Sequence, residues 1–149
     1  MTTTVGTEPT LQDLVTNLLH LEHDAIAAYD GTIERLDDAG AREQVQAFRA
    51  DHNRHVDELI SIAQRVGVEP PTGGDMKQML TTGKVALAGI AGDGALVKAM
   101  KTNEDDTVQA YEQASSNQAA DAAMRETFSA ALADERRHRA WMESYARKG

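Results

Sequence analysis

Two five-residue stretches, Asp51–His55 and Asp134–His138, carry the side chains with the clearest chemistry. These two pentads share an Asp, an Arg and a final His at matching places. Each also holds two metal-binding side chains three residues apart, at 52/55 and at 135/138. On an α-helix this spacing puts both side chains on one face. Mixed imidazole and carboxylate donors suit iron and manganese, so the pentads predict metal binding.

Each pentad lies within an apolar pattern of helical period. Apolar residues, and among them the metal-binding residues, recur in steps of three and four. This spacing marks one buried helix face. We therefore predict helices at about 41–66 and 118–146, with polar residues at core positions. The two faces are Val45, Phe48, His52, His55, Leu59, Ile62 and Val66, and Met124, Phe128, Ala131, Glu135, His138, Met142 and Tyr145.

Two further helices are predicted at about 10–37 and 94–116. Thr10 can cap the first. One glutamate interrupts the apolar face of each, Glu22 in the first and Glu104 in the second. Seven residues later, on the same face, follow Tyr29 and Tyr111. These tyrosines pack in the core or donate hydrogen bonds to the glutamates.

The connections predict how the helices are arranged. Residues 67–93 form a long crossover that begins near Pro70-Pro71 and contains a short helix at about 76–88. A connection of that length can run along a bundle and place helix 94–116 parallel to helix 41–66. The expected fold is all-α: an up-down four-helix bundle over residues 10–149, preceded by a flexible arm at 1–9.

Composition narrows the class of protein. The chain has 149 residues, no cysteine and a net charge of −9. Without thiolates there is no disulfide or iron–sulfur site, and an acidic chain is a poor ligand for nucleic acid. No apolar run approaches the ~20 residues of a membrane span. We expect a cytoplasmic protein that binds neither nucleic acid nor membrane and forms a homo-oligomer, taken as a homodimer.

The two halves of the chain resemble each other. Residues 22–29 and 104–111 share Glu, Asp, Ala and Tyr, four identities in eight. Glu22 precedes His52 by 30 residues, and Glu104 precedes Glu135 by 31. We predict an internal repeat of two helical hairpins, whose pseudo-two-fold axis brings the two polar centres together.

Six residues therefore form the candidate site. Burying carboxylates is unfavourable unless a positive charge compensates them, and a pair of divalent ions does so. A recurring solution in bundles is one Glu from each of two helices and Glu-x-x-His from each of the others. The alternative is a metal-free polar layer that fixes helix register. The candidate ligands are Glu22, His52, His55, Glu104, Glu135 and His138; Asp51 and Asp134, which can pair with Arg54 or Arg137, flank them.

This pattern resembles the ferritin-like superfamily, which includes ferritins, bacterioferritins and rubrerythrins, over residues 10–146. The chain looks most like small, uncharacterised bacterial ferritin-like proteins. Glu135–His138 matches the family's Glu-x-x-His motif. The resemblance implies one or two iron ions, with Glu22 and Glu104 as terminal ligands and Glu135 bridging. It further implies nitrogen ligands from His55 and His138, and oxidation of iron or reduction of oxygen or peroxide.

The chain departs from this family at one position. Family members that bind two irons have a bridging glutamate where this chain has His52. The donor set becomes three Glu and three His, which should stabilise a ferric pair less well. His52 is then a third nitrogen ligand or a proton donor. A single ion, manganese, zinc, or a metal-free bundle acting as a non-enzymatic stress-associated or interaction protein all remain open.

Overall fold

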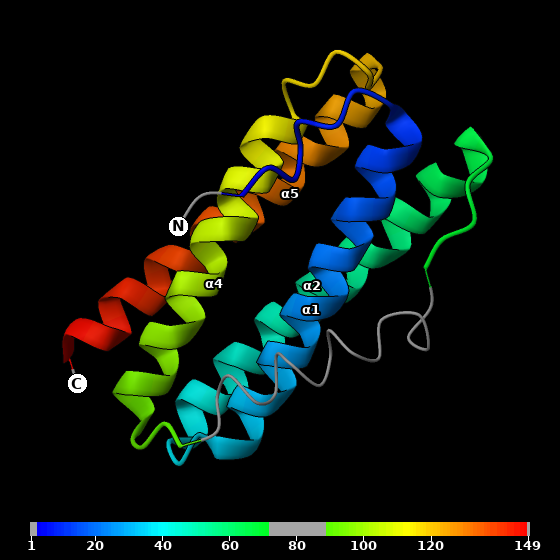
Figure 1. Ribbon diagram of the computed structural model, residues 1–149. Helices are drawn as coiled ribbons and strands as arrows, with labels where there is room; N and C mark the ends of the chain where they lie inside the picture. Colours follow the sequence, from blue (N-terminus) through cyan, green and yellow to red (C-terminus); the bar gives the residue numbers. More distant parts are fainter. Residues whose placement is uncertain (1–2, 72–88, 149) are drawn as a thin grey trace.

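The described residues, 3–71 and 89–148 of a computed structural model, fold into four α-helices (Figure 1). The helices are α1 (Leu11–Arg35), α2 (Ala39–Val66), α4 (Asp93–Ala114) and α5 (Ala122–Lys148). This confirms the predicted all-α four-helix bundle. The short helix expected at 76–88 lies outside the described residues.

The helices form two antiparallel pairs, α1 with α2 and α4 with α5 (Figure 1). The backbone N–H groups of Asp37 and Asp38, in the α1–α2 turn, donate to the Asp93 carboxylate at 2.9 and 2.8 Å. The start of α4 is thus fixed at the end of the bundle where α2 begins. As predicted, α4 therefore runs parallel to α2. The two pairs meet where α1 packs along α4 and, less extensively, where α2 meets α5.

Capping residues set the helix ends. The side chain of Thr10 accepts from Asp13 N at the start of α1, as predicted. Asp38 accepts from two backbone N–H groups, so α2 begins two residues before the expected position 41. At the start of α5, Asp121 Oδ1 accepts from the Met124 N–H at 2.8 Å. Because Asp121 takes the cap position, α5 begins at residue 122 rather than at the expected 118.

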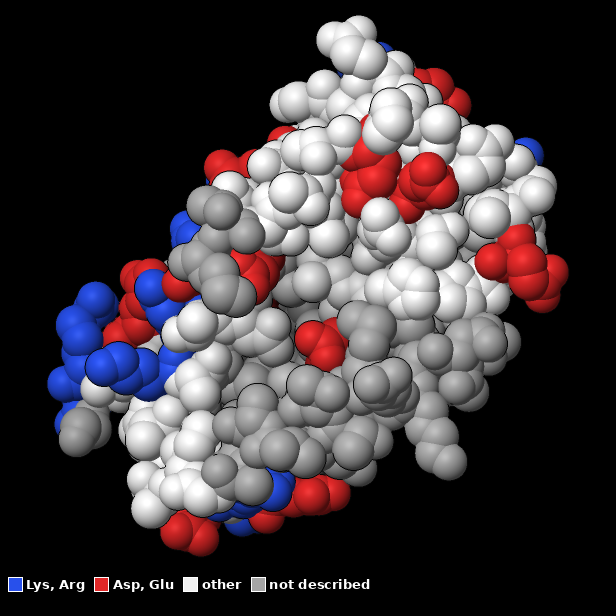
Figure 2. Space-filling model, in the orientation of Figure 1, with Lys and Arg blue, Asp and Glu red and all other residues white. Residues whose placement is uncertain are grey.

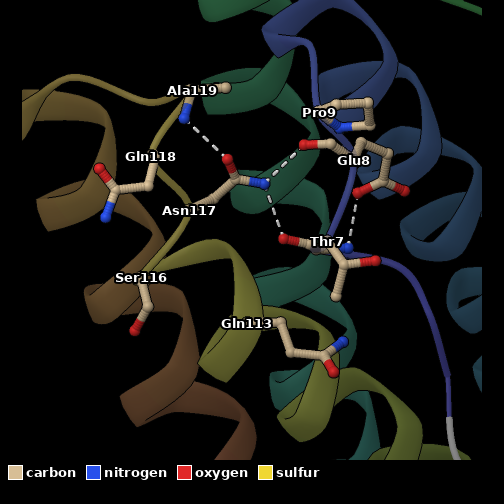
Figure 3. Close-up of a pocket in the computed structure, with 9 residues that line it drawn as sticks. Thr7, Glu8, Pro9, Gln113, Ser116, Asn117, Gln118 and Ala119 are labelled. Carbon is tan, nitrogen blue, oxygen red and sulfur yellow. Dashed lines mark hydrogen bonds between the residues drawn. The ribbon is translucent and has the colours of Figure 1, made fainter.

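Residues 3–9 lie against α4 and the turn that follows it (Figure 3). Gln113 Nε2 donates to two carbonyl oxygens of this segment at 3.2 and 2.7 Å, and Asn117 Nδ2 donates to two more at 2.8 and 2.9 Å. Gly6 has φ +104° and approaches α4 so closely that an added Cβ would lie 2.4 Å from the Ala110 carbonyl oxygen. Hydrogen bonds therefore hold residues 3–9 against α4 and the turn that follows it, within the stretch 1–9 that the sequence predicted to be a flexible arm.

The apolar core consists of two clusters with a polar layer between them. One cluster gathers side chains from the start of α1, the end of α2, the end of α4 and the start of α5, and the other lies toward the opposite end of the bundle. The principal members are Leu14, Leu18, Leu59, Ile62, Tyr111 and Phe128 in the first cluster, and Tyr29, Val45, Phe48, Val97, Met100 and Met142 in the second.

Charged side chains are spread over the face shown in Figure 2, and the basic ones gather toward the end of the molecule where α5 ends. Arg147 and Lys148 lie in the last turn of α5, where they complement the negative end of the helix dipole. Within the part of the chain that the structure describes, no helix is both long and apolar enough to cross a membrane.

Candidate metal centre

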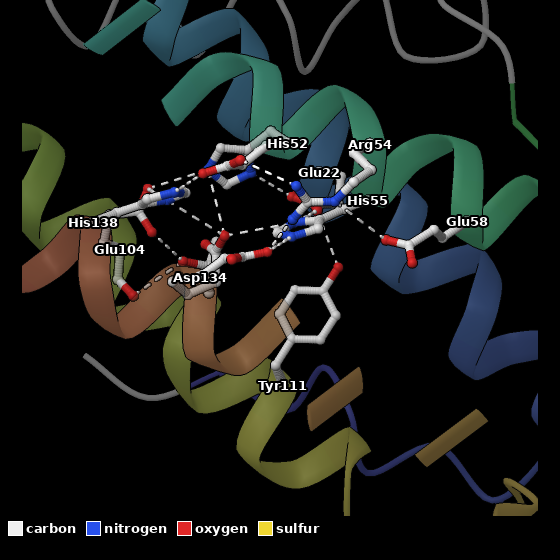
Figure 4. A network of polar contacts seen from close by, with 12 residues as sticks. Glu22, His52, Arg54, His55, Glu58, Glu104, Tyr111, Asp134 and His138 are labelled. Atoms are coloured by element: carbon white, nitrogen blue, oxygen red, sulfur yellow. Dashed lines mark hydrogen bonds and ion pairs between the residues drawn. The ribbon is translucent and has the colours of Figure 1, made fainter. Parts of the chain in front are cut away.

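All six predicted ligand residues meet in the polar layer between the two apolar clusters. Figure 4 labels five of them: Glu22, His52, His55, Glu104 and His138. One glutamate comes from α1 and one from α4, two histidines come from α2, and a glutamate and a histidine come from α5. None exposes more than 2% of its surface. This donor cluster consists of Glu22, His52, His55, Glu104, Glu135 and His138.

The donor cluster contains two overlapping sets of ligand atoms. Within each set, one atom from every residue lies within 4.8 Å of the others. His52 and Glu135 belong to both sets, so the two sets share a histidine and a carboxylate. The sets are Glu22, His52, His55 and Glu135, and His52, Glu104, Glu135 and His138.

Glu135 is buried with no hydrogen-bond partner for either carboxylate oxygen. Its Oε1 is 3.6 Å from one nitrogen of each of three rings, those of His52, His55 and His138. His138 Nδ1 also has no partner. Unpartnered buried polar atoms are rare in folded proteins. A carboxylate and three imidazole nitrogens that converge at this spacing fit a metal ion, which accepts electron pairs from both.

The pKa of Glu135 reflects this isolation. Burial raises the pKa well above its usual value, and the nearby Glu104 carboxylate raises it further, against the opposing effect of His52. A bound cation would favour the ionised carboxylate. The same position therefore suits either a proton or a metal ion.

Glu22 is stabilised by neighbouring donors. His52 Nδ1 lies 2.6 Å from one of its carboxylate oxygens and His55 Nδ1 lies 2.8 Å from the other. The Tyr111 hydroxyl donates to Glu22 Oε2 at 3.0 Å. Although burial raises the pKa of Glu22, the imidazoles of His52 and His55 outweigh it and lower the pKa to about 2.

Glu104 has a similar setting. The Tyr29 hydroxyl donates to Oε1 at 2.5 Å, and the Thr107 hydroxyl donates to Oε2 at 2.9 Å. Burial raises the pKa of Glu104, but the imidazoles of His138 and His52 hold it well below its usual value. Both glutamates of the α1/α4 pair are thus kept ionised within the core.

His52 presents one ring nitrogen to each donor set. Nδ1 faces Glu22, whereas Nε2 lies 3.3 Å from Glu104 Oε1 and 3.6 Å from Glu135 Oε1. Burial lowers the pKa of His52, but Glu135 and Glu22 raise it well above its usual value. For His55, burial also lowers the pKa, and Glu22 and Asp134 raise it overall. Protons on these rings compensate the buried carboxylates.

The two predicted aspartates hold histidines of the opposite pentad. His55 Nε2 lies 2.9 Å from Asp134 Oδ2, and His138 Nε2 lies 2.8 Å from Asp51 Oδ2. Each contact orients a ring so that its Nδ1 faces the donor cluster. A carboxylate behind a histidine commonly orients it for metal binding. Asp51 and Asp134 thus pair across α2 and α5, rather than with a histidine of their own helix.

Arginines close the cluster on the α2/α5 side. Arg137 Nη2 lies 2.8 Å from Asp51 and 3.1 Å from Asp134. Arg54 likewise contacts Asp134 and, at 3.2 Å, Asp51. The side chains of the two arginines are about half exposed, and those of the two aspartates are mostly buried. Burial raises the pKa of both aspartates, but the facing histidines and arginines lower the pKa overall.

Contacts between the two helix pairs are reciprocal. The tyrosine of α1 donates to the glutamate of α4, and the tyrosine of α4 donates to the glutamate of α1. In the same way, the aspartate of α2 contacts the histidine of α5, and the aspartate of α5 contacts a histidine of α2. This arrangement is what the predicted pseudo-two-fold axis would produce. The duplication of the sequence itself stays a prediction.

Thr107 and Phe48 are neighbours of the cluster that the sequence did not single out as such. Thr107 lies three residues after Glu104 on the same helix, and that spacing was the available signal for its hydrogen bond. Phe48 packs on His138 with ring centroids 4.3 Å apart. It occupies an ordinary apolar position in the pattern of α2, so its contact with the site could not be read from its type.

A surface hollow of about 490 Å³ lies beside residues 6–9 and the α4–α5 turn (Figure 3). Glu8 is the one charged residue among those that line it, and the Glu8 carboxylate already accepts from Gly6 N and Asn17 Nδ2, both at 2.7 Å. The hollow therefore offers little chemistry compared with the donor cluster.

Comparison with known proteins gives a family but no function. A family model described as a domain of unknown function, DUF2383, matches residues 10–117. The matched stretch holds four of the six residues of the donor cluster and ends before α5. No curated protein matches the chain, and no solved structure does. Because the family model covers well over half of the 149 residues, the chain belongs to the DUF2383 family.

Proposed function

We propose that this protein is a ferritin-like metal-binding bundle whose donor cluster holds one or two iron ions. The antiparallel helix pairs and the parallel course of α2 and α4 support a ferritin-like arrangement (Figure 1). The observation that carries the proposal is Glu135, a fully buried carboxylate with no hydrogen-bond partner that faces three imidazole nitrogens. A cation at that position would supply the bonding partner that both carboxylate oxygens lack.

The proposed ligands divide between the two donor sets. Glu22 and Glu104 are terminal ligands, Glu135 is shared between the sets, and His55 and His138 bind through Nδ1. His52 adds nitrogen to both sets. A bound iron ion supplies Lewis acidity and one-electron redox chemistry. The chemistry we propose is oxidation of ferrous iron or reduction of oxygen or peroxide.

The residues around the ligands keep the site ordered and dry. Tyr111 and Tyr29 orient the terminal carboxylates by hydrogen bonds. Asp134 and Asp51 hold the rings of His55 and His138 with Nδ1 turned inward. The two apolar clusters exclude water above and below the polar layer.

The donor set also bears on which metal is preferred. With His52 in place of a fourth carboxylate, the cluster provides three carboxylates and three imidazoles. Fewer negative charges weaken the preference for a ferric pair. Manganese or zinc, or a single ion, therefore compete with two irons in this proposal.

The test is metal content after reconstitution. Purified protein is incubated with ferrous iron in air, desalted and analysed by mass spectrometry for iron, manganese and zinc. We expect about one to two equivalents of metal per chain, because a preformed set of buried donors binds tightly. Glu135→Gln should lose most of this metal. Glu126→Gln, which changes an exposed glutamate of the same helix, should retain it.

Two results would contradict the proposed metal site. Less than about 0.2 equivalents of any transition metal in the wild-type protein would remove the proposal, since buried ligands of this number bind well below micromolar ion concentrations. Equal metal content in Glu135→Gln and wild type would show that the assigned ligands are wrong.

A second candidate is a metal-free bundle that acts in a stress response or through protein contacts. Glu22 supports it, because three donors already satisfy this carboxylate without a metal ion. In this candidate the polar layer fixes the register of the helices. Treatment with a chelator discriminates: it lowers the Tm of a metalloprotein and leaves the Tm of the metal-free bundle unchanged.

A further inference from the structure

Three of the few aromatic residues form a continuous run from the donor cluster to the surface. The chain has only two Phe, three Tyr and one Trp. The ring centroids of His138 and Phe48 are 4.3 Å apart, and those of Phe48 and Trp141 are 5.7 Å apart. The rings of Trp141 and Tyr145 are stacked, with centroids 5.1 Å apart. His138 and Phe48 are buried, whereas Trp141 and Tyr145 are partly exposed.

The outer end of the run carries a proton acceptor. The Tyr145 hydroxyl donates to Asp38 Oδ2 at 3.0 Å. A phenol gives up an electron far more easily when a neighbouring base takes its proton at the same time. Trp141 has the other readily oxidised side chain. Phe48 is not readily oxidised, but it fills the space between His138 and Trp141, and Arg137 covers its ring at 5.8 Å.

The two remaining tyrosines do not offer this route. Tyr29 and Tyr111 are at most 1% exposed, and their hydroxyls donate to Glu104 and Glu22 inside the cluster. They have no solvent-facing proton acceptor. The run through Trp141 therefore differs from ordinary aromatic packing, because oxidisable rings, solvent access and a base occur together along it.

We propose that Trp141 and Tyr145 form an electron-transfer route between the donor cluster and a small one-electron reductant of the ascorbate class in solution. This inference rests on the proposed redox metal. With an oxidised metal ion bound in the donor cluster, Trp141 would supply the one electron that reduces it. Tyr145 replaces that electron and passes its proton to Asp38. The reductant returns one electron to Tyr145, Asp38 returns the proton, and the reductant is the species oxidised.

The first test needs no metal and no turnover. Azidyl radicals generated by pulse radiolysis oxidise the single tryptophan, and the tryptophanyl and tyrosyl radicals are followed by their absorbance. In metal-free wild type we expect a tyrosyl signal to grow as the tryptophanyl signal decays, at a rate independent of protein concentration. Tyr145→Phe should lose this phase, and Tyr29→Phe should keep it.

Asp38 is tested by a variant that retains its structural role. Asp38→Asn keeps a capping side chain at the start of α2, since Asn caps as well as Asp. A carboxamide is a much weaker base, so transfer from Tyr145 to Trp141 should slow. A transfer phase that is unchanged in Tyr145→Phe would overturn the inference, whatever the behaviour of Asp38→Asn.

The second test links the route to the cluster. Iron-loaded and zinc-loaded protein are exposed to peroxide without reductant, and oxidation is mapped by peptide mass spectrometry. We expect oxidation at Trp141 and Tyr145 with iron and not with zinc, and ascorbate should suppress it. Metal-loaded protein without this pattern overturns the route alone. Wild type that transfers electrons from Tyr145 to Trp141 but binds no metal overturns both the link to the cluster and the proposed function.

Discussion

At the scale of single residues, the glutamates of the polar layer differ in what stabilises them. Glu22 faces two imidazole nitrogens and a tyrosine hydroxyl, and its pKa falls to about 2 despite burial, which raises it. Glu135 has no hydrogen-bond partner, and burial raises its pKa well above the usual value. One carboxylate is thus complete without a metal ion and the other is not. In metal-free protein, a substitution of Glu22 should therefore lower the free energy of unfolding, whereas a substitution of Glu135 should not.

Replacing Glu135 should separate stability from metal binding. In metal-free protein, Glu135→Gln removes a buried ionisable group that has no hydrogen-bond partner, so the free energy of unfolding should stay equal or rise by up to about 1 kcal/mol. In protein with added metal, the variant should lose the stabilisation that the wild type gains. Urea unfolding with and without metal measures both. A loss of several kcal/mol in the metal-free variant would contradict this account of Glu135.

Replacing Tyr111 should lower stability in both states. Tyr111→Phe removes the hydrogen bond to an ionised, buried carboxylate, so it should cost about 1.5–3 kcal/mol. Tyr145→Phe is the matched control, because its hydroxyl bonds to an exposed aspartate and its loss should stay within about 0.5 kcal/mol. Equal losses in the two variants would show that the hydrogen bond to Glu22 contributes nothing particular.

At the scale of helices, the periodic patterns predicted most of the site. Steps of three and four residues identified which face of each helix is buried, and all six predicted ligand residues lie on those faces. The level of the second helix pair was less predictable. The expected helices at 94–116 and 118–146 imply a turn at residue 117, and Glu104 and Glu135 lie at unequal distances from that turn in the sequence. Because Asp121 caps α5, the connection is longer, and Glu104 precedes the end of α4 by ten residues while Glu135 follows the start of α5 by thirteen.

The contacts of each aspartate with a histidine of the other helix, between α2 and α5, could not be predicted from either helix alone. Periodicity gives the buried face of a helix but not its rotation against a neighbour. Whether Asp51 meets His55 or His138 depends on that rotation. The docking of residues 3–9 had no sequence signal either, because it depends on side-chain amides of Gln113 and Asn117 that are far away in the sequence.

The docked segment gives a prediction for Gly6. Gly6→Ala forces an alanine into a positive φ and places its Cβ against the backbone of α4. Residues 3–9 should therefore detach, and their backbone amides should lose protection in hydrogen exchange. Gly67→Ala is the control, because Gly67 also has a positive φ, of +77°, but an added Cβ meets nothing within 4 Å. It should cost only about 1 kcal/mol. Retained protection of residues 3–9 in Gly6→Ala would contradict the docking.

At the scale of the whole molecule, the polar layer divides the core and involves every helix that the structure describes. A metal ion bound there would connect α1, α2, α4 and α5 in the folded state only. Such a ligand stabilises the fold by about 2.7 kcal/mol when its free concentration is a hundred times Kd. The homodimer remains a prediction, which light scattering of the purified protein can check.

Metal stabilisation should depend on pH with a definite sign. Burial lowers the pKa of both His52 and His55, but the facing carboxylates raise it overall, so protons occupy these rings in metal-free protein. A metal ion bound by these rings and by Glu135, whose pKa is also raised, must displace their protons, so its affinity should rise as pH rises through the raised pKa values. Calorimetric titration in buffers of different ionisation enthalpy measures the protons released. Affinity that falls or stays constant between acidic and neutral pH would contradict the assignment of these histidines.

Anomalous diffraction can show whether the donor cluster is where this protein binds metal. Crystals of iron-reconstituted protein are measured above and below the iron absorption edge. We predict one or two anomalous peaks between Glu135 and the rings of His52, His55 and His138, absent from Glu135→Gln crystals grown in the same way. Anomalous peaks confined to surface carboxylates, or no peak at all in a protein reconstituted with excess iron, would contradict metal binding at the donor cluster.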